Sequence, residues 1–271
     1  GSMQPFNYKN KYYLMCNGEI YNYKELAMRY NFKLDSQSDC EVILHLYNKF
    51  KDPSKFVELL DGVFSFILYD SESKQILISR DRYGVRPLYW GNNHNNSIII
   101  SSTLSGINHP DFNAEQFPPN VSCIFDQKNS PKFYHHDKYS NIRFKGSLNN
   151  NSFILNQLKL LLTQSVKKRL MSDRKICCLL SGGLDSSLIT SIVCKLKGAE
   201  NVDTFSIGMK GGTDTQYAEE VAQYLGTNHT SVILDKQEFI DAIPEVLNKV
   251  ETYDTTTIRA SVGNYLLSKY K

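Results

Sequence analysis

The sequence has no apolar run of membrane-spanning length among its 271 residues. Its longest apolar runs, such as residues 97–100, have the length of single buried strands. It also shows no charged segment followed by an apolar segment of the kind that forms a signal peptide. We therefore expect a cytoplasmic protein that does not insert into membranes.

The sequence also lacks a basic cluster and cysteine pairs with metal-binding spacing. The formal net charge is +3, and Lys and Arg are not concentrated on one predicted element, which argues against nucleic acid as a partner. The six cysteines form no Cys-x-x-Cys pair and lie mostly in apolar runs, so we interpret them as buried, reduced thiols. His135 and His136 lie in a polar, turn-rich stretch and are expected at the solvated surface.

What the sequence does contain is two successive patterns. Up to about residue 137, short runs of β-branched and aromatic residues alternate with turn residues, which predicts a strand-rich layer. Helical spacing interrupts this pattern at residues 23–30 and 39–50. The simplest arrangement is a sheet sandwich flanked by helices, an α+β fold.

A polar, turn-prone segment over residues 139–151 separates the two patterns, so we place a domain boundary between residues 145 and 146. After it, a helix beginning at Ser152 precedes alternating strands and helices. The strands are predicted at residues 176–180, 202–207 and 231–234, and the helices at 187–196, 215–225 and 236–250. This alternation predicts a parallel sheet in an α/β domain over residues 146–271.

One turn, Ser-Gly-Gly-Leu-Asp-Ser-Ser at residues 181–187, follows the first of these strands and opens a helix. Glycines permit close backbone approach, and serine hydroxyls together with the N–H groups of a helix N-terminus attract anions. The spacing is not that of a Walker A loop. Asp185 would repel a bare polyphosphate, so it is predicted to hold Mg²⁺ that bridges phosphate oxygens. A plain Gly/Ser helix N-cap is the alternative interpretation.

This string resembles the PP-loop of the ATP pyrophosphatase family, and other motifs resemble one branch of that family. The segments Glu-Thr-Tyr-Asp-Thr-Thr-Thr-Ile-Arg-Ala-Ser at 251–261 and Thr-Phe-Ser-Ile-Gly-Met at 204–209 are similar to glutamine-dependent asparagine synthetases. Upstream, residues 17–22, 38–41, 60–66 and 80–89 resemble the class II glutamine amidotransferase domain. The resemblance covers the chain from about residue 4 to residue 271.

The resemblance implies an Ntn-type glutaminase sandwich over residues 1–145 and a PP-loop synthetase domain over residues 146–271. In such proteins the first domain hydrolyses glutamine, and ammonia travels inside the protein to the second. The second domain uses ATP and Mg²⁺ to form β-aspartyl-AMP from aspartate, which ammonia converts to asparagine. The implied partners are therefore the small substrates aspartate, glutamine and ATP, and we expect a homodimer.

In the first domain, the resemblance assigns four residues to glutamine. Asn17 and Gly18 are implied to form the oxyanion hole, with a side-chain amide and a backbone N–H, and to bind glutamine. Glu19 and Asp39 are implied to hold the ammonium group of glutamine by opposite charge. Taken alone, an Asn-Gly pair is more typical of a tight turn.

In the second domain, the resemblance assigns eight residues to ATP and three to aspartate. The ATP residues are Leu179 and Ile207, which match adenosine contacts, and Ser181, Gly182, Gly183, Asp185, Ser186 and Ser187 around the pyrophosphate, with Asp185 on magnesium. Thr256, Thr257 and Arg259 match positions that hold aspartate, where a guanidinium suits a carboxylate. The alternatives are plain sheet core for Leu179 and Ile207 and a solvated helix charge for Arg259.

Some parts of the family pattern have no counterpart in this sequence. No cysteine precedes Cys16, although the family's nucleophile is an N-terminal cysteine, and Cys16 is expected to be a buried thiol at a strand end. The arginine segment that binds the glutamine carboxylate is expected before Gln4, and the Ser-Gly-Glu-Gly-type loop of the ATP site is expected after Lys271. We therefore expect an internal fragment, incomplete in both domains and inactive by itself.

Two alternatives from other classes stay open. One is a truncated, catalytically incomplete nucleotide-binding homologue that pairs with another chain. The other is a PP-loop ligase of the β-lactam synthetase type, which the Thr-Thr-Ile-Arg-Ala-Ser run at 256–261 disfavours, because the aspartate-binding pattern should change with the substrate.

Overall fold

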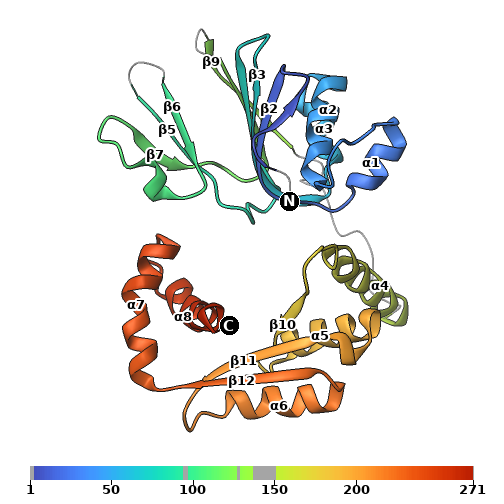
Figure 1. Ribbon diagram of the computed structural model, residues 1–271, viewed down its shortest axis with the longest axis vertical. Coiled ribbons are helices and arrows are strands. Elements are labelled where there is room, and N and C mark those ends of the chain that lie inside the picture. The colour runs from blue at the N-terminus through green and yellow to red at the C-terminus, as the bar shows by residue number, and fades with distance from the viewer. Residues whose placement is uncertain (1–2, 94–96, 127–128, 137–150, 271) are drawn as a thin grey trace. The chain divides into compact units, whose positions relative to one another are not determined.

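The computed structural model describes residues 3–93, 97–126, 129–136 and 151–270, whose helices and strands are shown in Figure 1. The chain divides into two compact units, Gly1–Lys145 and Gly146–Lys271. The predicted domain boundary falls within residues 137–150, which lie outside the described residues. Each unit combines sheets and helices, so the mixed α/β character expected from the sequence is present in both.

The larger sheet of the first unit has six strands in the order β1-β2-β3-β4-β8-β9, each antiparallel to its neighbours. The strands are β1 Phe6–Tyr8, β2 Tyr12–Ile20, β3 Gly62–Asp70, β4 Gln75–Arg80, β8 Val121–Asp126 and β9 Asn129–His135. Alternation along β2 sends Leu14, Cys16 and Ile20 to one face, where all three are buried.

Helices cover this face of the large sheet (Figure 1). They are α1 Tyr23–Tyr30, α2 Val42–Phe50 and α3 Pro53–Phe56, with the 3-10 turns η1 Asp39–Glu41 and η2 Val57–Leu59. Helix α2 places Val42, Ile43 and Leu46 at helical spacing in the core shared with the sheet. The helix predicted over residues 39–50 is therefore a 3-10 turn followed by an α-helix.

A smaller sheet lies on the other side of the large one (Figure 1). It contains β5 Tyr89–Asn92, β6 Ile98–Ser101 and β7 Asn113–Gln116, which are antiparallel and lie in the order β6-β5-β7. The 3-10 turn η3 Leu104–Ile107 lies between β6 and β7 in the sequence. Leu88, Trp90 and Phe117 pack against Ile78 and Cys123 of the large sheet. The first unit is thus a two-sheet sandwich with helices on one side.

The second unit contains a three-stranded parallel sheet in the order β10-β11-β12. Its elements are α4 Asn151–Arg169, β10 Cys177–Leu179, α5 Leu184–Lys197, η4 Ala199–Asn201, β11 Asp203–Met209, α6 Asp214–Leu225, β12 Asn228–Leu234, α7 Lys236–Val250 and α8 Thr255–Lys269. The order from β10 to α7 is the predicted one. Helix α8 has no counterpart among the predicted elements, because its apolar residues do not form a single stripe.

The two faces of this sheet are covered differently. Parallel strands added in one direction place their crossover helices on the same face, and Thr215 of α6 lies against Gly208 there. On the opposite face, Ile207 lies next to Gly263 of α8. That face is only partly covered by the described residues, so Leu179 on the edge strand β10 is 50% exposed.

The cysteine prediction is correct for four residues and wrong for one. All six cysteines are free, with Cys16, Cys40, Cys123 and Cys194 buried, Cys178 intermediate and Cys177 exposed. Cys177 was expected inside the core because it lies in an apolar run. It is exposed because it lies on β10, at the edge of the sheet and on its partly covered face.

The prediction for His136 is also wrong, since this side chain is 5% exposed rather than solvated. Its Nε2 atom lies 2.7 Å from the hydroxyl of Ser122, which in turn lies 2.8 Å from the hydroxyl of Ser79. Partners on β4 and β8 therefore allow the imidazole to be buried.

Within the part of the chain that the structure describes, no helix is both long and apolar enough to span a bilayer.

A polar cluster lies between α6 and the parallel sheet. The Nδ1 atom of His229 is 2.8 Å from the hydroxyl of Thr204, and its Nε2 atom is 3.1 Å from the hydroxyl of Ser206. Ser231 donates to the Glu219 carboxylate at 2.7 Å. Burial lowers the pKa of His229, and the charge of Glu219 opposes this shift. The neutral imidazole is therefore the form that links β11 to β12.

We expect the second unit to lose stability as the pH falls below about 6.5, the ordinary pKa of histidine. The unfolded chain takes up the proton first, because the pKa of His229 is lowered in the folded state. The loss stops below the folded-state pKa, and solvent screening keeps it small because His229 is only partly buried. Hydrogen exchange of the β11 and β12 amides at about pH 7.5 and about pH 5.5, corrected for intrinsic rates, measures this loss. His229→Gln should weaken the pH dependence, and an equal dependence in the variant would contradict the assignment.

Candidate functional sites

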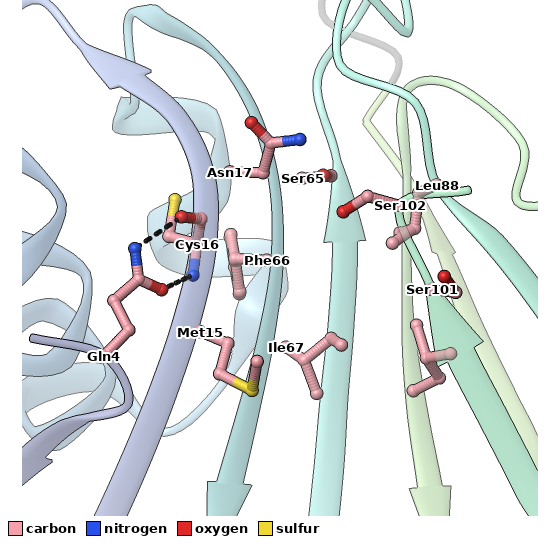
Figure 2. A pocket seen from close by; sticks show the side chains of 11 residues that line it. Gln4, Met15, Cys16, Asn17, Ser65, Phe66, Ile67, Leu88, Ser101 and Ser102 are labelled. Carbon is pink, nitrogen blue, oxygen red and sulfur yellow. Dashed lines mark hydrogen bonds between the residues drawn. The ribbon is translucent and has the colours of Figure 1, made fainter. Parts of the chain in front are cut away.

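The edge of strand β2 beyond Leu14 is held by side chains instead of a neighbouring strand. Strand β1 pairs with β2 only as far as Leu14. At the next edge position, the Gln4 carboxamide donates from Nε2 to the Cys16 carbonyl at 2.8 Å and accepts from the Cys16 N–H at 2.7 Å. Figure 2 shows this double hydrogen bond, which fixes the main chain directly before Asn17.

The 3-10 turn η1 holds the same edge further along. The Ile20 N–H donates to Oδ2 of Asp39 at 2.6 Å, and the Cys40 thiol donates to the Gly18 carbonyl at 3.6 Å. Along an antiparallel strand, the N–H and C=O groups of alternate residues point to the same edge. The Gly18 N–H therefore points to the same edge as those of Cys16 and Ile20, whose main chains are held by hydrogen bonds. A preoriented N–H of this kind can bind an oxyanion.

Only glycine fits at position 18. Its φ is +153°, and a Cβ atom there would lie 2.2 Å from the Val63 carbonyl oxygen and 2.6 Å from Cα of Phe64. The tight-turn alternative for Asn17 and Gly18 is wrong, because both lie inside β2, paired with Ser65 and Phe64 of β3. Cys16 is likewise within the strand and not at its end.

A cavity of about 400 Å³ lies beside this strand. Its lining residues are Gln4, Met15, Cys16, Asn17, Ser65, Phe66, Ile67, Leu88, Ile100, Ser101 and Ser102. Figure 2 shows Asn17 and Ser65 toward one end of the cavity and Met15 and Ile67 toward the other. The cavity therefore presents an amide at one end and apolar side chains at the other.

The structure brings together the four residues predicted for glutamine. Asn17, Gly18 and Glu19 are consecutive in β2, and Asp39 is hydrogen-bonded to the neighbouring Ile20. The Glu19 carboxylate lies 3.8 Å from Nη2 of Arg86, and both side chains are partly exposed. The Asp39 carboxylate thus lies at the β2 edge next to Gly18, and the Glu19 carboxylate on the same strand has one guanidinium beside it.

Glu41, to which the sequence analysis assigned no role, anchors the segment before Asp39. It accepts hydrogen bonds from the N–H groups of Asp35 and Ser36, both at 2.7 Å, and from the Ser36 hydroxyl at 2.5 Å. Burial acts to raise the pKa of Glu41, but these hydrogen bonds and His45 lower it overall. Its place in the Ser-Asp-Cys-Glu segment was the sequence signal for this role.

In the second unit, the loop at residues 181–187 joins the carboxyl end of β10 to the first turn of α5. Gly182 has a φ of +77°, and a Cβ atom there would lie 2.5 Å from Cβ of Tyr217 in α6. Glycine at this position therefore lets α6 pack directly against the loop. Gly183 is the N-cap of α5 and carries no side chain to cap the first N–H groups.

The hydroxyl groups of this loop bond to one another and to its main chain. The hydroxyls of Ser181 and Ser186 are 2.9 Å apart, and the Ser187 hydroxyl donates to the Gly183 carbonyl at 2.7 Å. Asp185 is exposed in the first turn of α5. Hydroxyls, helix N–H groups and one carboxylate together suit a polyphosphate with a divalent cation.

No three His, Cys, Asp or Glu side chains are grouped for metal binding anywhere in the described ranges. A cation at Asp185 would take its other oxygen ligands from phosphate and water, which is the usual situation for Mg²⁺. The residues that are present therefore fit magnesium carried by a nucleotide and do not form a complete protein site.

Leu179 and Ile207 lie on the sheet face opposite α6. Leu179 is half exposed and Ile207 is partly buried, so the plain-core alternative does not describe Leu179. Both side chains are available to an apolar ligand near the carboxyl ends of the parallel strands, which is the usual ligand side of such sheets.

The first two turns of α8 carry the three residues predicted for aspartate, and all three are exposed. Asp254 caps this helix by accepting from the N–H of Thr257 at 2.7 Å and from its hydroxyl at 2.6 Å, which lowers the pKa of Asp254. Thr256, Arg259 and Gly263 follow at helical spacing on one side of α8. Since Gly263 lies next to Ile207, this side of the helix extends along the same face of the sheet.

Comparison with known families matches both units. The model of the glutamine amidotransferase domain matches residues 1–152, and the asparagine synthase model matches residues 157–270. Glutamine-hydrolysing asparagine synthetases of Mus musculus and Homo sapiens are each 40% identical over 296 residues, which cover 99% of this chain and 52% of theirs. A probable asparagine synthetase of Acanthamoeba polyphaga mimivirus is 38% identical over 288 residues with the same coverage. The chain spans about half the length of these relatives.

Two solved structures are also similar to the chain. The allosteric regulatory enzyme of purine biosynthesis has a TM-score of 0.44 and 13% identity, with 85% of this chain and 62% of that chain covered. The glutamine phosphoribosylpyrophosphate amidotransferase from B. subtilis has a TM-score of 0.45 and 13% identity, with 86% and 64% covered.

Proposed function

Because the chain belongs to the family that joins a glutamine amidotransferase domain to an asparagine synthase domain, we propose that it serves the synthesis of asparagine. Glutamine supplies ammonia, and ATP activates the β-carboxylate of aspartate. The products are asparagine, glutamate, AMP and pyrophosphate. The observation that carries this proposal is the placement of Gly18, whose N–H points to the β2 edge between the hydrogen-bonded residues Cys16 and Ile20, beside the Asn17 amide and the cavity.

The first unit supplies the glutamine site in this proposal. The Gly18 N–H and the Asn17 amide stabilise the negative oxygen that develops when the side-chain amide of glutamine is attacked. The Glu19 and Asp39 carboxylates bind the ammonium group of glutamine by opposite charge. The constraints on Cys16, Gly18 and Ile20 support this role, because an oxyanion donor is effective when it is already oriented.

The second unit supplies the ATP and aspartate sites. Ser181, Gly182, Gly183, Ser186 and Ser187 would surround the pyrophosphate of ATP in this proposal, and Asp185 would hold its magnesium. When bound, Mg²⁺ would neutralise charge on the phosphate oxygens. Leu179 and Ile207 contact the adenosine, while Thr256, Thr257 and Arg259 hold aspartate. The shared face of Ile207 and α8 supports this arrangement.

The proposal predicts aspartate-dependent exchange of pyrophosphate into ATP by the complete gene product. Arg259→Gln should raise the aspartate concentration needed for half-maximal exchange by about tenfold, since a charged hydrogen bond contributes about 1.5 kcal/mol or more. Lys249→Gln, which removes an exposed cation at the end of α7, is the matched control and should leave exchange unchanged.

Exchange that does not depend on aspartate would instead favour a PP-loop ligase with another substrate. ATP binding without exchange would favour the nucleotide-binding homologue.

The homodimer and the cytoplasmic location belong to the same proposal. Light scattering coupled to size-exclusion chromatography measures the first, and cell fractionation measures the second.

A further inference from the structure

We propose that Arg86 is a positioning residue of the glutamine site that acts through the Glu19 carboxylate, and that Arg80 and Asp81 fix the loop carrying Arg86. This inference rests on the proposed glutaminase function. The loop comprises residues 82–87, between β4 and β5.

Asp81 holds the N–H groups of this loop. Its Oδ1 atom accepts from Tyr83 at 3.0 Å and from Val85 at 3.1 Å, and its Oδ2 atom accepts from Arg86 at 3.1 Å. The Oδ2 atom also accepts from the N–H of Phe64 at 3.2 Å. Because Phe64 is the residue paired with Gly18, a single carboxylate connects the loop to the strand beside the oxyanion position.

Arg80 holds the carbonyl groups of the same loop. Its guanidinium donates to the carbonyl oxygens of Gly84 and Arg86, both at 2.8 Å, and to that of Phe117 at 2.6 Å. Arg80 is 4% exposed and Asp81 is 2% exposed, so water does not compete strongly for these bonds. Burial lowers the pKa of Arg80, and the charge of Asp81 opposes this shift.

The main chain of Arg86 is therefore held from both sides, with its N–H on Asp81 and its carbonyl on Arg80. Its side chain reaches toward Glu19, with 3.8 Å between Nη2 and Oε1. The buried Nε atom of Arg86 has no hydrogen-bond partner among the described residues. The loop thus fixes the main chain from which the Arg86 side chain extends, and the Glu19 carboxylate is the charged group that its guanidinium faces.

This placement matters because Glu19 and Asp39 are two carboxylates assigned to one ammonium group. Without a cation, their mutual repulsion would favour Glu19 rotamers that point away into water. The guanidinium of Arg86, which extends from a fixed main chain, attracts Glu19 toward the site, where the ammonium group of the substrate binds to the two carboxylates. Arg86 acts on substrate binding through Glu19 and does not contact the reacting amide.

The test is the kinetics of L-glutamine hydrolysis by the complete gene product. Arg86→Ala should raise KM about fivefold, as expected for a partly exposed ion pair, and leave kcat within about twofold. Arg86→Lys should restore most of the affinity because it keeps the positive charge. The main-chain bonds of residue 86 do not need its side chain, so neither variant removes the contacts with Arg80 and Asp81.

Two controls separate positioning from a general structural effect. Arg29→Ala removes an exposed guanidinium that lies over the Tyr30 ring, and it should not change KM. Asparagine synthesis from added ammonia should be equal in all variants, since it bypasses glutamine. An unchanged KM in Arg86→Ala, or an equal defect in Arg86→Lys, would overturn the inference. Absence of glutamate release by the wild-type protein would instead overturn the proposed function, and the inference with it.

Discussion

Replacing Gly18 by alanine should destabilise the first unit by about 3 kcal/mol and reduce glutamine hydrolysis by the complete gene product at least about 100-fold. The new Cβ atom would lie 2.2 Å from the Val63 carbonyl oxygen and 2.6 Å from Cα of Phe64, both of which are main-chain atoms. No side-chain rotation relieves such contacts, so β2 and β3 must separate locally. The separation also displaces the Gly18 N–H from its oriented position.

Urea unfolding followed by the fluorescence of Trp90 measures the first effect, because Trp90 is the single tryptophan of the chain and lies in the first unit. Gly263→Ala is the control for loss of a glycine outside the first unit, and it should leave the unfolding midpoint reported by Trp90 unchanged. Its Cβ atom would lie 3.5 Å from Ile207, an ordinary contact, and alanine favours the helix by up to about 1 kcal/mol. A wild-type unfolding midpoint in Gly18→Ala would show that the strand pairing described here is wrong.

Replacing Asp81 by alanine should destabilise the first unit by about 3–5 kcal/mol. The substitution removes the acceptor for four main-chain N–H groups, those of Phe64, Tyr83, Val85 and Arg86. It also removes the negative charge that opposes the lowering of the Arg80 pKa by burial. Buried donors without partners and a buried charge without its counterpart are both costly, and here they occur together.

The same unfolding measurement applies to Asp81→Ala, with the m-value recorded to detect a change in cooperativity. Asp111→Ala is the matched control in the same unit. Asp111 is exposed, and its carboxylate lies 3.8 Å from Nδ1 of His109, so this change should stay within about 0.5 kcal/mol. A loss below about 1 kcal/mol for Asp81→Ala would contradict the role assigned to the Asp81 carboxylate.

Much of the secondary structure could be predicted because local patterns match the periods of helices and strands. The apolar residues Val42, Ile43 and Leu46 predicted the buried side of α2, and the alternation of strands and helices predicted the parallel arrangement of β10, β11 and β12. The 181–187 loop was recognisable in the sequence because its glycines and serines are consecutive and lie between a strand and a helix. Helix α8 was not predicted, because its apolar residues are spread around the helix.

For the candidate glutamine site, the sequence identified residues but not the contacts that orient them. Asn17 and Gly18 have the local preference of a turn, yet nine residues of β2 pair continuously with β3 and override that preference. Gln4, Cys40 and Asp39 reach the β2 edge from segments that are distant in sequence. No local pattern encodes such contacts, since they depend on how the segments pack.

The sequence by itself determined the order of the elements from β10 to α7, the glycine- and serine-rich string at 181–187 and the family, because each of these is written in consecutive residues or regular spacings. Only the tertiary structure decided that His136 is buried, that Cys177 and Leu179 are exposed, and that Arg80 and Asp81 hold the loop of Arg86. The physical reason is that burial and hydrogen bonding depend on what lies across the sheet or beyond its edge. Those neighbours come from remote parts of the chain, so composition and periodicity contain no record of them.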